Sequence, residues 1–238
     1  RKLLGFGDEE VISDIQDNAL HILNGCNDPR NNGENWGDNR QGLVYGMVQS
    51  GKTASMLSLI SLGMRAGYRL FIVLAGDKSS LRDQTQNRVN GAFDVEGGSN
   101  RREFIHSPTH VSDFRQIANG NYISNFKFNE RTGRGENWTT IIVMKKQTHH
   151  LNALIAQLND LQFALEEAGH DMGQILPTMI LDDEADYASQ NTRIQDGGST
   201  THNDLVNLRN AIPRNCYLAY TATPQACLSA NPASLIGY

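Results

Sequence analysis

Hydrophobic residues recur along this chain with two different spacings. Short apolar runs, which are typical of strands buried in a parallel sheet, occur at 43–45, 69–75, 141–144, 179–181 and 216–220. Helical spacing or helix-capping residues predict helices at 9–24, 54–65, 79–89, 148–168 and 204–212. Because strands alternate with helices, the pattern predicts an α/β fold, with a mostly parallel central sheet in a three-layer α/β/α arrangement.

The chain is expected to divide at about residue 40. Residues 1–40 read as an N-terminal helix and loop packed on the rest, and residues 41–238 read as one lobe. Weaker patterns predict a short strand at 104–106 and a short helix at 111–117.

Composition is that of an ordinary globular protein. The 238 residues are 39% hydrophobic and 20% charged, with a formal net charge of −5. No apolar run reaches the length of about 18 residues that spans a bilayer, so we expect no membrane partner. Cys26, Cys216 and Cys227 are odd in number and irregular in spacing, which predicts reduced thiols and a cytoplasmic location.

The segment between the first strand and the next helix has the strongest chemical signature. Residues 46–53 read GMVQSGKT, and a strand, a glycine loop, Lys-Thr and a helix in this order are typical of a phosphate-binding loop. Glycine lets successive N–H groups face an anion, and the helix start adds its positive dipole end. Lys52 would reach the β and γ phosphates, and the Thr53 hydroxyl would hold Mg²⁺. We assign nucleotide binding to Gly46, Gln49, Ser50, Gly51, Lys52 and Thr53.

The loop ahead of this segment is open to two interpretations. Trp36, Arg40 or Gln41 would contact the base of a bound nucleotide, or Trp36 would anchor a surface loop rich in Asn and Gly.

An acidic cluster follows the strand at 179–181. Asp183 is assigned to the metal and Glu184 to the attacking water, because nucleotide hydrolysis needs one carboxylate for each task. Lys52, Asp183 and Glu184 are therefore the predicted catalytic residues. The alternative is an acidic helix start favoured by the dipole.

A third cluster follows the last strand. Thr221 and Thr223 carry hydroxyls that would couple to the acidic cluster through Asp186 and relay the state of the γ phosphate. The alternative is an ordinary turn that ends at Pro224.

Polar residues after the second strand form a fourth cluster. Arg82, Gln84, Thr85 and Arg88 would grip the phosphates of a nucleic-acid backbone, although a solvated helix face is an equal alternative. The pair at 145–146, two lysines, is a similar candidate, whereas the histidines at 149–150 read as surface residues.

These motifs resemble those of superfamily-two helicases, in the Asp-Glu-Ala-Asp at 183–186, the Thr-Ala-Thr at 221–223 and the Gly-Lys-Thr at 51–53. More narrowly, five segments look like those of the Z-one domain, a bacterial family labelled as an endonuclease. These segments are 46–53, 74–76, 81–88, 182–186 and 220–224. The resemblance runs from about 40 to 226. It implies a RecA-like ATPase lobe that belongs to larger bacterial proteins linked to restriction or phage defence.

Together these features favour the first motor lobe of a superfamily-two-like protein that binds Mg²⁺ and ATP and acts on nucleic acid, with DNA favoured over RNA. The resemblance implies a second RecA-like lobe in the full-length protein, which would supply an arginine finger worth about 10³–10⁵ in rate. We therefore expect slow turnover from this lobe alone. Two alternatives stay open: a nucleotide-gated scaffold without hydrolysis, and a metal-dependent endonuclease that uses Asp182 with Asp183 and Glu184.

Overall fold

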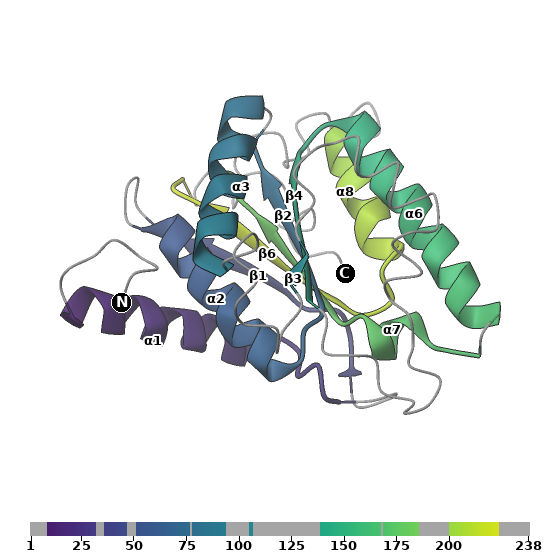
Figure 1. Cartoon of the computed structure of the whole chain (residues 1–238), viewed down its shortest axis with the longest axis horizontal. Coiled ribbons are helices and arrows are strands. Elements are labelled where there is room, and N and C mark those ends of the chain that lie inside the picture. The colour runs from purple at the N-terminus through teal and green to yellow at the C-terminus, as the bar shows by residue number, and fades with distance from the viewer. Residues whose placement is uncertain are drawn as a thin grey trace.

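The computed structural model describes residues 9–31, 36–46, 51–76, 78–93, 105–106, 139–167, 169–185 and 200–223. Its centre is a six-stranded sheet with the order β1-β6-β5-β2-β4-β3, in which every pair of neighbours is parallel (Figure 1). The strands are β1 (Gln41–Tyr45), β2 (Leu70–Ala75), β3 (Ile105–His106), β4 (Thr139–Lys145), β5 (Thr178–Asp182) and β6 (Asn215–Thr221).

Helices cover both faces of this sheet. One face carries α1 (Glu9–Gly25), α2 (Lys52–Ala66) and α3 (Ser79–Phe93), and the other carries α6 (Thr148–Glu167), α7 (Met172–Ile175) and α8 (Thr200–Asn210) (Figure 1). The predicted α/β class, with three layers and a parallel central sheet, is therefore confirmed.

Side-chain alternation along the strands builds two cores. In β2, Phe71 and Val73 face the core beneath α1, α2 and α3, whereas Leu70 and Ile72 face the core beneath α6, α7 and α8. Every residue of β2 is buried, as expected for a strand covered on both faces. Each large aliphatic side chain buried in this way contributes about 1.5–3 kcal/mol.

Two elements differ from the pattern prediction. The four-residue helix α7 was not predicted, because it is too short for a hydrophobic period and begins at the side-chain cap that Asp171 provides to the N–H of Gly173. Helix α8 begins at Thr200, four residues before the start predicted for it at 204. The short strand near 104–106 is confirmed as β3, and the helix predicted at 111–117 lies outside the described residues.

The loop before β1 is anchored by Trp36. Trp36 is buried, its Nε1 donates to Asn39 Oδ1 at 2.9 Å, and the Arg214 guanidinium lies 5.7 Å from its ring centre. The Asn27 side chain also donates to the Trp36 carbonyl at 2.8 Å. Since Arg214 comes directly before β6, Trp36 lies at the amino end of that strand, which supports the anchoring interpretation over contact with a nucleotide base.

Cys26 and Cys216 are free thiols buried in the same core, and Cys227 lies outside the described residues. Within the described part of the chain, no helix is long and apolar enough to cross a membrane.

Candidate functional site

Helix α2 begins at the predicted phosphate loop. Its N-terminal cap is Gly51, whose φ of 78° is a left-handed conformation that glycine adopts without steric cost. Lys52 and Thr53 follow in the first turn and are partly exposed. That turn contains no acidic residue, so no carboxylate of α2 offsets the positive end of the helix dipole beside these two side chains. Gln49 and Ser50 lie outside the described residues.

The entrance to the loop is tied to the end of β6. The N–H of Gly46 donates to the Thr221 carbonyl at 3.1 Å, and Tyr45 is paired with Thr221 in the parallel register. The buried Thr221 hydroxyl accepts from the N–H of Thr223 at 2.9 Å. The threonine turn therefore contacts the start of the phosphate loop directly, although Asp186, its predicted link to the acidic cluster, lies outside the described residues.

The chain turns sharply after β5, and both neighbouring strands hold the turn. The N–H of Asp183 donates to the Leu74 carbonyl at 3.0 Å, and the N–H of Ala185 donates to the Tyr220 carbonyl at 2.9 Å. Glu184 has a φ of 53°, which is uncommon for a residue with a side chain. Such backbone strain persists only where the surroundings enforce it, and it concentrates at functional sites.

Gly76, just beyond β2, makes room for the Glu184 carboxylate. A Cβ on Gly76 would lie 3.1 Å from Glu184 Oε2 and 3.2 Å from Leu81 Cδ1. The Glu184 side chain therefore lies over the end of β2, between the acidic turn and the start of α3.

Lys146 is the site residue whose role the sequence analysis missed. It directly follows β4, its Nζ donates to the carbonyls of Asp183 at 2.7 Å and Glu184 at 2.9 Å, and it lies 2.9 Å from Asp182 Oδ1. The Lys146 and Asp182 side chains are 0% exposed, and the Tyr217 hydroxyl donates to the second oxygen of Asp182. This burial contradicts the grouping of Lys146 with surface residues that contact nucleic acid. The only signal in the sequence was a lysine immediately after an apolar strand.

The charges around Asp183 connect the acidic turn to the phosphate loop. Burial, and next the Glu184 carboxylate, raise the pKa of Asp183 above its ordinary value, while the Lys52 and Lys146 ammonium groups oppose that rise. Lys52 comes from the start of α2 and Asp183 from the end of β5. The structure therefore places the two predicted groups within electrostatic reach of each other.

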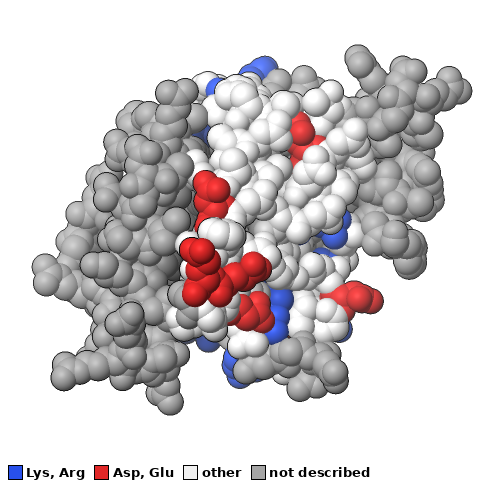
Figure 2. Space-filling view, turned by 90° about the vertical axis from the view of Figure 1, so that its right-hand side faces the viewer, with Lys and Arg blue, Asp and Glu red and all other residues white. Residues whose placement is uncertain are grey.

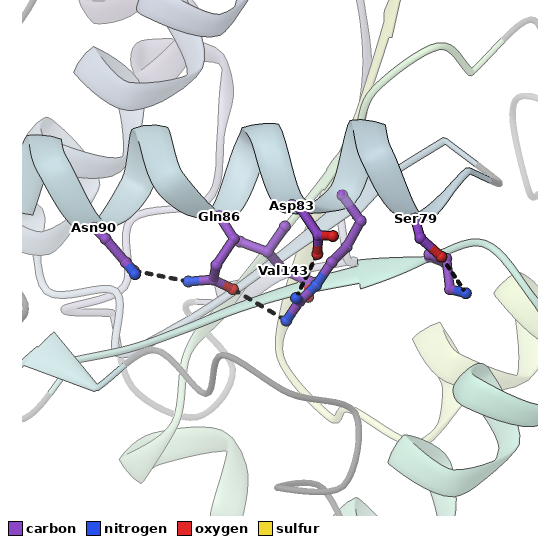
Figure 3. Close-up of polar contacts among 7 residues, drawn as sticks. Ser79, Asp83, Gln86, Asn90 and Val143 are labelled. Carbon is purple, nitrogen blue, oxygen red and sulfur yellow. Dashed lines mark hydrogen bonds and ion pairs between the residues drawn. The ribbon is translucent and has the colours of Figure 1, made fainter.

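Helix α3 turns its four predicted nucleic-acid residues in two directions. Arg82 and Thr85 are buried, whereas Gln84 and Arg88 are exposed. The Arg82 guanidinium donates to the Val143 carbonyl at 3.2 Å and to Asp83 at 2.9 Å, within a chain of contacts that continues along α3 (Figure 3). Arg82 therefore fastens α3 to β4, and its burial contradicts the predicted contact with a nucleic-acid backbone.

Arg88 lies beside the phosphate loop. Its Nη1 donates to Thr53 Oγ1 at 2.9 Å, which joins the second half of α3 to the first turn of α2.

His150 is buried at the start of α6, which contradicts the surface position predicted for it. Burial, with further contributions from His149, Lys145 and Arg82, lowers the pKa of His150 to about 4.

The three carboxylates proposed for the nuclease alternative are not presented together. Asp182 is fully enclosed by Lys146 and Tyr217, so only Asp183 and Glu184 have exposed surface. Among the residues that the structure describes, no group of three or more His, Cys, Asp or Glu side chains is arranged to hold a metal ion.

Comparison with known proteins finds similarity at the level of structure alone. Neither the known protein-family profiles nor the curated protein sequences contain a match. One similar structure is a nuclease-deletion mutant of the Type ISP restriction-modification enzyme LlaGI in complex with a DNA substrate mimic. Its identity is 12% and its TM-score 0.45, over 89% of this chain and 17% of that chain. Another is a variant of S. cerevisiae Dbp5 bound to RNA and ADP BeF3, with 14% identity and a TM-score of 0.44, over 95% of this chain and 48% of that chain. The chain thus spans less than half of either protein.

Proposed function

We propose that this chain is the ATP-binding and hydrolysing first lobe of a superfamily-two-like motor that acts on nucleic acid. The observation that carries the proposal is the placement of Lys52 and Asp183. They follow β1 and β5, two strands separated in the sheet by β6 alone, and the charge of Lys52 acts on Asp183. Ligands of parallel α/β sheets bind at this carboxyl edge of the strands.

The residues at this edge fit a magnesium nucleotide. Asp183 carries a carboxylate whose charge is disfavoured by burial and by Glu184, so a divalent cation beside it would be favourable. The Thr53 hydroxyl and the Asp183 carboxylate would hold Mg²⁺, which neutralises phosphate charge when bound. Lys52 would bind the β and γ phosphates, and the exposed Glu184 carboxylate would orient the attacking water.

One face of the molecule is unsuited to a nucleic-acid backbone. Figure 2 shows acidic side chains gathered on the side that α6 and α8 cover. Helix α6 has no lysine or arginine, and its Asp160, Glu166 and Glu167 are exposed. Nucleic acid is therefore expected at the carboxyl edge of the sheet, where the exposed Gln84 would contact the backbone. We keep DNA as the favoured ligand, with a second RecA-like lobe completing the groove.

Three finer parts of the proposal rest on sequence resemblance. They are membership of the Z-one family, the RecA-like character of the lobe, and a role in restriction or phage defence. The proposed cytoplasmic location rests on the number and spacing of the cysteines.

Calorimetric titration with ATP and Mg²⁺ tests the nucleotide site. Lys52→Ala should weaken ATP binding by about 10- to 100-fold, since it removes a charged hydrogen-bond donor to phosphate. Glu184→Gln should bind as the wild type does, but turn over more slowly when the full-length protein is assayed. Lys145→Ala, whose Nζ bonds to Ser79 Oγ at 3.1 Å, is the matched control and should bind normally. Wild-type affinity in Lys52→Ala would overturn the proposal.

The same preparations separate the alternatives. ATP binding by the full-length protein, without turnover that DNA or RNA stimulates, would favour the nucleotide-gated scaffold. Cleavage of DNA that needs Mg²⁺ but not ATP, and that is lost in Asp183→Asn, would favour the endonuclease.

A further inference from the structure

The hydroxyl that the proposed function gives to Mg²⁺ already has a cationic partner. Arg88 Nη1 lies 2.9 Å from Thr53 Oγ1, and the two residues are 35 positions apart on different helices. Arg88 is exposed and Thr53 is partly exposed, so this contact lies at the surface of the site and not in the core.

This contact is incompatible with a metal ion held as proposed. A guanidinium within hydrogen-bond distance of Thr53 Oγ1 would repel a divalent cation bound to the same oxygen. Arginine keeps its charge at every relevant pH, so deprotonation cannot relieve the conflict. The guanidinium therefore has to leave Thr53 when Mg²⁺ binds there.

The chemistry of the guanidinium indicates where it would go. Its planar fork of N–H donors matches the oxygens of a phosphate, and charge-assisted bonds of this kind are about twice as strong as neutral ones. A nucleotide with three phosphates brings its terminal phosphate oxygens close to the metal that Thr53 would bind. A nucleotide with two phosphates lacks that acceptor.

We propose that Arg88 is the residue by which this lobe distinguishes a nucleoside triphosphate from a diphosphate. Without the metal, the Arg88 guanidinium donates to the Thr53 hydroxyl. With Mg²⁺ and a triphosphate, the guanidinium pairs with the terminal phosphate. With a diphosphate, Arg88 stays in competition with Mg²⁺ for Thr53. This inference rests on the proposed function, and it assigns Arg88 to the nucleotide in place of the nucleic-acid backbone.

The test measures two quantities, and both should fall when the Arg88 guanidinium is removed. In Arg88→Ala, the preference for ATP over ADP should fall by about 10- to 100-fold, because one charged bond to the terminal phosphate is lost. The Mg²⁺ concentration needed for ADP binding should also fall, because the competing cation is gone. A role confined to holding α3 against α2 would weaken binding of both nucleotides together. Calorimetry with ATP and with ADP, each over a Mg²⁺ series, gives both quantities.

Two further variants keep the test decisive. Arg65→Ala removes an exposed arginine from the last turn of α2 and should leave both quantities unchanged. Arg88→Lys keeps the charge without the fork and should give an intermediate preference, so it replaces Arg88→Ala if that variant does not fold. An unchanged ATP-to-ADP ratio in Arg88→Ala or Arg88→Lys, with Lys52→Ala still impaired, would overturn this inference and leave the proposed function standing. Normal ATP binding by Lys52→Ala would instead overturn the proposed function.

Discussion

Asp182 and Asp183 are neighbours in the chain, but they belong to two different regions of the site. Asp182 lies with Lys146 and Tyr217 in what we call the buried cluster, where the ion pair is fully enclosed. Asp183 lies with Lys52 and Glu184 in what we call the open cluster, where burial and a like charge raise the pKa of its carboxyl. In the buried cluster, the lysine and the aspartate are paired with each other inside the protein. In the open cluster, we propose that the same two residue types bind a ligand. Three predictions test this division.

The largest effect is expected from the buried cluster. Lys146→Met should lower the free energy of unfolding by about 3–5 kcal/mol, because it leaves the enclosed Asp182 carboxylate without its cation. The loss should be visible as a shift of the urea midpoint with an unchanged slope. Adding Asp182→Leu should restore most of the stability, since an apolar pair can replace a buried ion pair.

Lys145→Met is the control for this change. Its ammonium group bonds to Ser79 at the surface, so the expected loss is below about 1 kcal/mol. A loss of that small size in Lys146→Met would show that the buried cluster does not hold the acidic turn.

A smaller effect of opposite sign is expected from the open cluster. Asp183→Asn should raise the free energy of unfolding at neutral pH by about 0.5–2 kcal/mol, the usual gain where a functional group is held at a cost to stability. Asparagine can still accept the bond that Asp183 Oδ1 receives from the N–H of Glu184 at 3.0 Å. The same variant should lose Mg²⁺-dependent nucleotide binding.

The raised pKa of Asp183 also predicts the direction in which stability changes with pH. Because the folded pKa of Asp183 is raised, the folded state binds the proton more tightly than the unfolded chain does. Stability should therefore fall as pH rises from the ordinary aspartate range through the raised value, and should show no further change from this group above it. Urea titrations across that range should find that the free energy of unfolding depends less steeply on pH in Asp183→Asn than in the wild type. Asp160→Asn, at an exposed position on α6, should keep the wild-type dependence on pH. An equal slope in both variants would contradict the raised pKa.

The smallest effect concerns the backbone of the open cluster. Glu184→Gly should raise the free energy of unfolding by about 0.5–1 kcal/mol. Glycine would remove the cost of the left-handed conformation at this position, about 1–2 kcal/mol. This gain exceeds the free-energy cost of the greater entropy of glycine in the unfolded chain, about 0.5–1 kcal/mol. ATP hydrolysis by the full-length protein should be lost. A loss of stability would show that the Glu184 side chain supports the turn, and would remove the strain argument for its role.

Local patterns predicted the elements well where burial is complete. The strand residues Phe71, Ile72 and Val73 are apolar without a break because β2 is covered on both faces, and the expected strand is confirmed there. Local patterns were less successful where a cap decides the element, as at α7, which was not predicted and whose start depends on the Asp171 side chain.

The candidate site was predicted in part, for a related reason. Motif spacing is sufficient to propose Lys52, Asp183 and Glu184 as site residues, because a strand followed by a polar cluster is a local pattern. It could not show that Lys146 faces inward beneath the acidic turn or that Arg88 reaches Thr53, because each contact joins segments at least 35 positions apart.

The sequence by itself determined the alternation of strands and helices and the polar clusters at the strand ends, because hydrophobic period and glycine position act over a few residues. The tertiary structure alone decided the strand order, the enclosure of Asp182 and the partner of Thr53. The strand order depends on which strands become neighbours in the sheet, and the two side-chain environments depend on which distant segments pack around them. No single segment of the chain encodes such long-range contacts.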